Sequence, residues 1–348
     1  MKVVLFCKKP YAFGIMMPLY KELIKQKHDT IWYIPDNIKD KIPDFLKTCS
    51  QCNSMRELLL FNAEANFAPG NDFPHYLPGV KIQIFHGMAG EKSGHFRIRH
   101  YFDLYLTQGP YFTDRFLKLK RKFKNFEVKE TGWCKIDTLF TPLEQSKELL
   151  KNEYKAVILY APTFSPGLTS ASKYKDAIYN LAKNNNYFIY IKFHDKMDQD
   201  VVKMYQDFAH KKENVAVSTD SDIIPLLQTC HLMISDTSSV VYEFLLLNKP
   251  VITFNSASEN IRWDNISDSE DLSSVVENNL ENDPYADQRQ WFIENYHPFT
   301  DGNSSARMIK AAEEYITTHG IPKERKIPLL RRRKMYKTFG KKPNILMG

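Results

Sequence analysis

One segment, residues 232–254 (LMISDTSSVVYEFLLLNKPVITF), has the pattern of a strand, a tight loop, a helix, a turn and a second strand. The apolar run Leu232–Ser235 precedes four residues of N-cap chemistry, Asp236, Thr237, Ser238 and Ser239. An apolar helix then runs to an Asn-Lys-Pro stop, and a β-branched strand follows. A β-α-β crossover of this kind builds a parallel sheet and places the hydroxyl cluster at the carboxyl end of a strand.

Two interpretations of the Asp-Thr-Ser-Ser run are open. Proteins with α/β folds bind phosphate where a strand ends and a helix begins, because free amides and the helix dipole both favour anions. The simpler alternative is a helix N-cap and nothing more. Four hydroxyl or carboxylate side chains in a row exceed what one cap uses, so we favour a phosphate site.

The length of 348 residues exceeds the usual span of one core and suggests two domains. Expected strands and helices alternate in two successive series, which predicts an α/β protein with two Rossmann-like domains facing a central cleft. We expect an acceptor-side domain at 1–141, a helical linker from Pro142 and a nucleotide-donor domain at 142–320. No G-x-G-x-x-G motif supports a nicotinamide or flavin cofactor. The strands expected in the first half are Val3–Cys7, Thr30–Ile34, Leu58–Phe61, Lys81–Phe85, Leu104–Thr107 and Glu127–Thr131.

The five cysteines are odd in number and scattered, which is typical of reduced cytoplasmic thiols. Cys49 and Cys52 lack a second Cys or His pair at zinc spacing, so we expect no metal site there. The apolar start of the chain is too short for a signal peptide and predicts a first strand instead. No apolar run is long enough to predict a transmembrane helix.

Basic charge is concentrated in a C-terminal tail, residues 321–348, which holds ten Lys or Arg and one acidic residue. The net charge of the whole chain is +7, so the rest is nearly neutral. Such a tail can bind nucleic acid or an anionic membrane, or it can be a disordered solvated segment. Apolar side chains between the charges suit a bilayer interface, and we expect peripheral attachment at the inner face of the cell membrane. These side chains are Ile327, Leu329, Leu330, Met335, Tyr336 and Phe339.

Histidines end two of the expected strands, one in each half of the chain. The sequence Ile82–Gly87 ends in His86-Gly87, where the glycine is expected to let the chain turn sharply. The sequence Ile189–His194 ends in the second histidine. One such histidine is more often a hydrogen-bonded structural residue than a catalyst. Two, each at the carboxyl end of a strand, can meet across one cleft, and this favours a catalytic role.

Six motifs occur in an order that resembles the CDP-glycerol glycerophosphotransferases, the primases and polymerases of teichoic acids and related glycerol-phosphate capsules. The resemblance covers about residues 80–310 and implies a GT-B fold, a terminal helix that crosses back, and no metal or cofactor requirement. The motifs are I-F-H-G (84–87), T-G-x-x-K-x-D (131–137), I-L-Y-A-P-T (158–163), I-K-F-H (191–194), I-S-D-T-S-S (234–239) and F-T-D-G-N-S-S-A-R (299–307).

The resemblance implies transfer of a polyol phosphate from a CDP-alcohol donor to a hydroxyl of a glycan or lipid-linked acceptor, with release of CMP. We expect His86 to accept the hydroxyl proton, because neutral imidazole is a base near pH 7. We expect His194, Thr163 and Lys192 to face the diphosphate. The remaining expected binding residues are Gly87, Lys135, Asp236, Thr237, Ser238, Ser239 and Glu243.

Two acidic residues of these motifs have simpler alternatives. Glu243 lies four residues after Ser239 on one helix face and is expected to bind ribose hydroxyls, or else to be a surface acid. Asp137 is expected to hold a loop rather than to take part in chemistry, and Asp236 to cap a helix rather than to bind a metal.

The acceptor-side motifs depart from the family pattern, whereas the nucleotide-side motif is intact. Trp133-Cys134-Lys135 stands where an aromatic-Pro-Arg sequence is usual, Asp195 replaces proline after His194, and the basic residue after His86-Gly87 is displaced to Lys92. These departures leave the acceptor and the transferred polyol less certain than the donor type.

Three other classes remain as alternatives. A GT-B glycosyltransferase with a nucleotide-sugar donor uses a similar phosphate site. A non-hydrolysing sugar-nucleotide epimerase shares the fold but favours glycines where Ser238 and Ser239 stand. A nucleic-acid-binding protein would depend on the tail and its salt-sensitive contacts, and we do not expect one.

Overall fold

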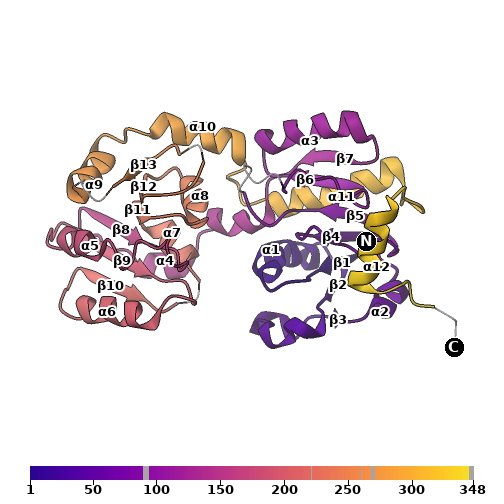
Figure 1. Cartoon of the computed structure of the whole chain (residues 1–348), viewed down its shortest axis with the longest axis horizontal. Helices are drawn as coiled ribbons and strands as arrows, with labels where there is room; N and C mark the ends of the chain where they lie inside the picture. The colour runs from indigo at the N-terminus through magenta and orange to yellow at the C-terminus, as the bar shows by residue number, and fades with distance from the viewer. Residues whose placement is uncertain (89–93, 221, 260, 268–270, 345–348) are drawn as a thin grey trace. The chain divides into compact units, whose positions relative to one another are not determined.

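The computed structural model describes residues 1–88, 94–220, 222–259, 261–267 and 271–344. The chain forms two compact units (Figure 1). The first unit comprises Met1–Asp137 and Asn295–Gly348, and the second comprises Thr138–Glu294. Each unit contains one parallel sheet with helices, which confirms the prediction of two Rossmann-like α/β domains.

The first unit is built on seven parallel strands: β1 (Lys2–Phe6), β2 (Asp29–Tyr33), β3 (Gln51–Cys52), β4 (Ala65–Ala68), β5 (Val80–Gln83), β6 (Leu104–Thr107) and β7 (Glu127–Glu130). Their order in the sheet is β3-β2-β1-β4-β5-β6-β7. The order reverses between β1 and β4, and ligands of open α/β sheets bind at the carboxyl ends of strands near such a point.

Helices cover both faces of this sheet. One face carries α1 (Tyr11–Lys25) and α11 (Ser304–His319), which contact each other, and α11 also contacts β5 and β6. The other face has a core of buried aliphatic and aromatic side chains from β1, β6 and the helices α2 (Met55–Phe61), α3 (Pro110–Phe123) and α12 (Leu329–Phe339). Figure 1 shows α1 and α12 on opposite sides of the sheet. The described residues also form the short 3-10 helices η1 (Asp36–Lys41), η2 (Asp44–Leu46) and η3 (Cys134–Phe140).

The second unit is built on six parallel strands: β8 (Ala156–Tyr160), β9 (Tyr187–Lys192), β10 (Val215–Ser218), β11 (Leu232–Ser235), β12 (Val251–Phe254) and β13 (Asp264–Ile266). Their order is β10-β9-β8-β11-β12-β13, so β8 and β11 are neighbours at the point where the order reverses. The helices are α4 (Glu144–Glu148), α5 (Lys175–Leu181), α6 (Gln199–Ala209), α7 (Ile224–Thr229), α8 (Val240–Leu245), α9 (Leu272–Glu281) and α10 (Ala286–Tyr296).

The expected strand Leu58–Phe61 is wrong, because these residues form the end of helix α2. A capping box starts this helix: Ser54 accepts a hydrogen bond from the Glu57 amide, and the Glu57 carboxylate accepts one from the Ser54 amide. The strand beside β1 is instead Ala65–Ala68, which the sequence pattern did not predict. All four of its residues are buried, so it has no polar alternation to reveal it.

The compact units differ from the expected ranges 1–141, 142–320 and 321–348, because the chain after residue 294 returns to the first unit. The Asp137 carboxylate accepts hydrogen bonds from the Ser304 and Ser305 amides at the start of α11. This return matches the terminal helix that crosses back in the resembled family.

Residues 321–344 of the basic tail are folded against the first unit; residues 345–348 lie outside the described part. Met335 is fully buried, and Ile327 and Phe339 pack against the same core. Half of the apolar side chains expected at a bilayer are therefore used inside the protein. Leu329 and Leu330, in contrast, are 73% and 80% exposed. Among the described residues, no helix is both long and apolar enough to span a bilayer.

Candidate functional site

His86 lies just past the end of β5, at the carboxyl edge of the first sheet, and its side chain is exposed. Its Nδ1 lies 3.0 Å from the carbonyl oxygen of Pro69, which follows β4. The ring centroid is 5.3 Å from that of Tyr11, the first residue of α1. A carbonyl can only accept, so Nδ1 carries the proton and the neutral ring presents the Nε2 lone pair. This is the tautomer that a general base requires.

The turn before His86 is made by a different residue from the one expected. Phe85, not Gly87, has the left-handed backbone, with φ at 61°. The Phe85 ring is buried and stacks on His95, with centroids 4.6 Å apart. Aromatic burial offsets the backbone strain of about 1–2 kcal/mol that a side chain meets in this region. Gly87 accepts a hydrogen bond from Gln108 Nε2 at 3.2 Å, which holds the turn to the end of β6.

The motif at residues 131–137 joins the first sheet to α11. Lys135 Nζ lies 5.6 Å from the centroid of the Trp133 ring. Gly132 has a φ of 79°, and a Cβ there would lie 2.4 Å from Ser304 Oγ. The Trp133 amide donates to Nε2 of the fully buried His297 at 2.9 Å. The motif therefore serves to build this junction. Asp137 has a structural contact, but it holds the start of α11 rather than the expected loop.

Stability should depend on pH through His297. Burial lowers its pKa to about 4, whereas the unfolded side chain titrates near pH 6.5. Between these values only the unfolded chain binds the proton, so the contribution to stability is complete above the unfolded pKa and falls as the pH drops. We expect a loss of about 3 kcal/mol towards pH 4.

Urea unfolding of the wild type and of His297→Gln across this pH range measures the effect. The variant should show a shallower decline of the free energy of unfolding. Parallel declines would contradict the assignment. The pH dependence would then come from groups present in both proteins, such as His95, whose pKa burial also lowers to about 4.

Asp236 lies at the end of β11 in the second unit and is 1% exposed. Its Oδ1 accepts from the Thr163 amide at 2.9 Å, and its Oδ2 accepts from the Ser170 amide and hydroxyl, both at 2.8 Å. Burial raises the pKa of this carboxyl. Asp236 thus fixes the loop after β8 and brings Thr163 to the Asp-Thr-Ser-Ser run. Thr237 Oγ1 similarly accepts from the Ala257 amide at 2.9 Å.

Ser238 and Ser239 are the members of the run that remain open to a ligand. No side chain caps α8, so the simple N-cap interpretation is wrong. The serine hydroxyls have no hydrogen-bond partner within the described part of the chain, and Ser239 is exposed. Since α8 has only six residues, the two hydroxyls matter more here than the helix dipole. They suit an acceptor-rich group such as a phosphate.

His194 follows β9 and is exposed. Its Nδ1 accepts from the Lys196 amide at 3.2 Å, so the neutral ring carries its proton on Nε2. Its ring centroid is 4.4 Å from that of Phe164, a contact that the sequence motifs did not suggest. His194 therefore presents a hydrogen-bond donor, whereas His86 presents a hydrogen-bond acceptor.

Lys192 and Glu243 are both 8% exposed. Lys192 Nζ donates to the Phe193 carbonyl at 2.7 Å, which holds the ammonium near the end of β9. Glu243 lies on α8, and its burial excludes the alternative of a surface acid. Contact of either side chain with a nucleotide stays a prediction.

Two other expectations concern the displaced Lys92 and the pair Cys49 and Cys52. Residues 89–93, which include the displaced Lys92, lie outside the described part of the chain. Cys49 and Cys52 are free thiols. Within the described residues, no three His, Cys, Asp or Glu side chains gather as a metal ion would require. Tyr11 and the Pro69 carbonyl, which position His86, carried no signal in the sequence because Pro69 acts through its backbone.

The two Rossmann-like units form a GT-B fold, which solved structures share. A wall teichoic acid polymerase, TagF, superposes with a TM-score of 0.59 at 17% identity, over 90% of this chain and 89% of the other. A UDP-N-acetylglucosamine 2-epimerase from Listeria monocytogenes, described as putative, superposes with a TM-score of 0.66 at 13% identity, over 94% and 99%. At these identities the likeness concerns the fold alone.

Sequence comparison is more specific. Residues 21–262 match the model of the CDP-glycerol:poly(glycerophosphate) glycerophosphotransferase family, and the chain belongs to that family. It is a CDP-glycerol glycerophosphotransferase-like enzyme. The teichoic acid ribitol-phosphate polymerase TarK of Staphylococcus aureus is 24% identical over 89% of this chain and 68% of its own length. For the related polymerase TarL the chain spans 60% of the relative's length.

Proposed function

We propose that the enzyme transfers a glycerol-phosphate or related polyol-phosphate unit from a CDP-alcohol to a hydroxyl of a glycan or lipid-linked acceptor. The step belongs to the synthesis of teichoic acid or a related capsule and releases CMP. Family membership and the named polymerase relatives support the donor class, and a solved TagF structure was soaked with CDPG. The observation that carries the proposal is the Nε2 lone pair of His86, fixed by the Nδ1 hydrogen bond to Pro69.

In the proposed reaction, the acceptor hydroxyl oxygen attacks the β-phosphorus of the donor. A new P–O bond forms, the bond from phosphorus to the bridging oxygen breaks, and CMP leaves with that electron pair. His86 Nε2 takes the hydroxyl proton. His194 Nε2–H and the hydroxyls of Ser238 and Ser239 donate to phosphate oxygens as charge moves onto the leaving group. The reaction therefore depends on positioning the substrates and stabilising charge, rather than on a covalent enzyme intermediate.

A panel of activated donors tests the proposal. The enzyme is incubated with CDP-glycerol, CDP-ribitol and UDP-sugars, together with a polyol-phosphate-primed acceptor, and released nucleotides are quantified. We expect CMP from a CDP-alcohol and no UDP from the sugars. Ser238→Ala/Ser239→Ala should weaken donor binding ~10-fold or more, since two donors to phosphate are removed. UDP release without CMP would instead support the nucleotide-sugar glycosyltransferase.

We also propose that the enzyme works at the inner face of the cell membrane. The exposed Leu329 and Leu330 precede the four basic residues 331–334, a combination that suits an anionic bilayer surface. Truncation at Gly320 would uncover the core around Met335, so point substitutions are the better test.

Leu329→Ser/Leu330→Ser should reduce flotation with anionic liposomes, because serine removes the apolar area that enters the interface. Leu60→Ser, at a 58% exposed leucine of α2, is the matched control and should float like the wild type. Equal flotation of all three proteins, or of none, would exclude this surface as an anchor.

A further inference from the structure

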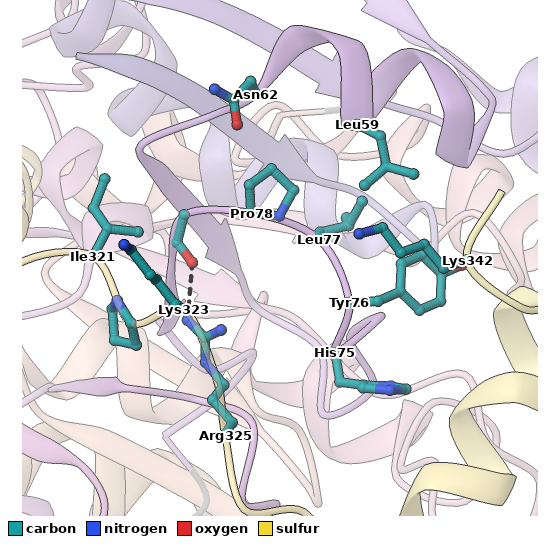
Figure 2. Close-up of a pocket in the computed structure, with 12 residues that line it drawn as sticks. Leu59, Asn62, His75, Tyr76, Leu77, Pro78, Ile321, Lys323, Arg325 and Lys342 are labelled. Carbon is teal, nitrogen blue, oxygen red and sulfur yellow. Dashed lines mark hydrogen bonds between the residues drawn. The ribbon is translucent and has the colours of Figure 1, made fainter. Parts of the chain in front are cut away.

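A pocket of about 400 Å³ opens at the amino-terminal edge of the first sheet. Gly79, which lines it, directly precedes β5, whereas His86 lies beyond the other end of that strand. Asn62, at the end of α2, lines it from the side of β4. The pocket and the proposed base are therefore at opposite edges of one sheet. Figure 2 shows its lining.

The basic tail builds one side of this pocket. Arg325 donates through Nε and Nη2 to the Asp103 carboxylate, at 2.7 and 2.5 Å, and through Nη2 to the Gly79 carbonyl at 3.0 Å. The Tyr76 hydroxyl donates to the Phe339 carbonyl at 3.1 Å. These contacts hold the tail in place at Arg325, before α12, and at Phe339, the last residue of α12. The tail residues that line the pocket are thus already folded in place.

The charge at the mouth of the pocket is positive and unbalanced. Asp103 neutralises Arg325, but Lys323 and Lys342 have no ion-pair or hydrogen-bond partner among the described residues. In the view of Figure 2 the ammonium groups of Lys323 and Lys342 lie on opposite sides of Pro78. His75 Nδ1 is buried at the same pocket, also without a partner in the part of the chain that is described. Two free cations at one pocket suit an anion.

The other walls are apolar, which selects against a bare ion. Leu59, Leu77, Pro78 and Ile321 also line the pocket. The volume lies within the usual range for small-molecule sites, which combine apolar walls with a few polar groups that fix orientation. The ligand should therefore have a carbon skeleton beside its negative charge.

We propose that this pocket binds a phosphodiester flanked by polyols, as a subsite for the growing chain far from the reacting end. The choice of a polyol phosphate rests on the proposed function, whereas the anion site itself rests on Lys323, Lys342 and the pocket. Lys323 and Lys342 hold the phosphate, and Asn62 binds a hydroxyl. A second hold on the polymer would keep a long acceptor attached between additions, as linked binding events do.

Binding of glycerophosphoglycerol, a soluble diester of this chemistry, tests the proposal by calorimetry without turnover. Wild-type protein should bind it, and Lys323→Glu/Lys342→Glu should bind it ~10-fold more weakly or not at all. Lys326→Glu/Lys337→Glu changes the charge of the same tail equally, at exposed positions outside the pocket, and should bind like the wild type. Thermal melting of both variants confirms that they are folded.

Each other result is decisive. Equal losses in the two double variants would show only the general field of the tail, and no wild-type binding at about 10 mM would remove the site. Binding to phosphatidylglycerol vesicles but not to the soluble diester would reassign the pocket to a lipid headgroup. CMP release with a short acceptor should persist in Lys323→Glu/Lys342→Glu. The binding assay therefore fails or succeeds independently of the donor assay.

Discussion

His86→Ala is expected to lower kcat by about 10²–10⁴-fold, the usual contribution of a positioned general base. Affinity for the CDP-alcohol should change little, because the base acts on the acceptor proton and its interaction develops only in the transition state. Rates of CMP release give kcat, and calorimetry with the donor alone gives the affinity. His194→Ala should lose both, since in the proposed mechanism its Nε2–H would donate to the donor phosphates in the ground state as well.

The matched control is His319→Ala, at an exposed histidine in the last turn of α11. It should turn over like the wild type. Near-normal kcat in His86→Ala would exclude this residue as the base. A lowered kcat together with a lowered melting temperature would instead indicate that the bond to Pro69 matters for the fold, so both are measured for each variant.

The α/β class and the parallel sheet of the second unit were predictable from the local sequence pattern. The segment 232–254 has the pattern of a strand, a helix and a strand within 23 residues, and the structure has β11, α8 and β12 there. The secondary-structure prediction was wrong where the local sequence pattern fits both a strand and a helix. Leu58–Phe61 is apolar enough for a strand, and only the Ser54–Glu57 capping box identifies a helix.

The sequence named candidate site residues, whose contact with a substrate stays a prediction, but it did not predict the hydrogen bonds that position them. Asp236 was expected at a ligand, yet its carboxylate accepts from the Thr163 and Ser170 amides, which are 73 and 66 residues away in sequence. The tautomers of His86 and His194 are set by a carbonyl and an amide, and no side-chain motif encodes these. The return of the tail depends on Asp103 and Arg325, 222 residues apart. Long-range pairs of this kind leave no periodic signal.

Asp103→Asn is expected to destabilise the first unit by about 3–5 kcal/mol, because it leaves the guanidinium of Arg325 without a counter-charge. The two side chains are 5% and 9% exposed. Asp103 also accepts from the Lys81 amide at 2.8 Å, and burial and then Arg325 lower the pKa of the Lys81 ammonium well below its usual range. The Asp103 carboxylate opposes this shift, so its loss would favour the neutral Lys81 amine still further.

Urea unfolding of Asp103→Asn, Arg325→Gln and the double variant gives the coupling energy of the pair. The double variant should lose less than the sum of the single losses, since it leaves no unpaired charge. The exposed pair Lys129–Glu314 in the same unit is the control, and Glu314→Gln should have no measurable effect. Because Arg325 anchors the tail, trypsin should also cleave residues 321–344 earlier in Asp103→Asn than in the wild type. Wild-type stability with a protected tail would show that the packing of Met335 and Phe339, not the ion pair, holds the tail in place.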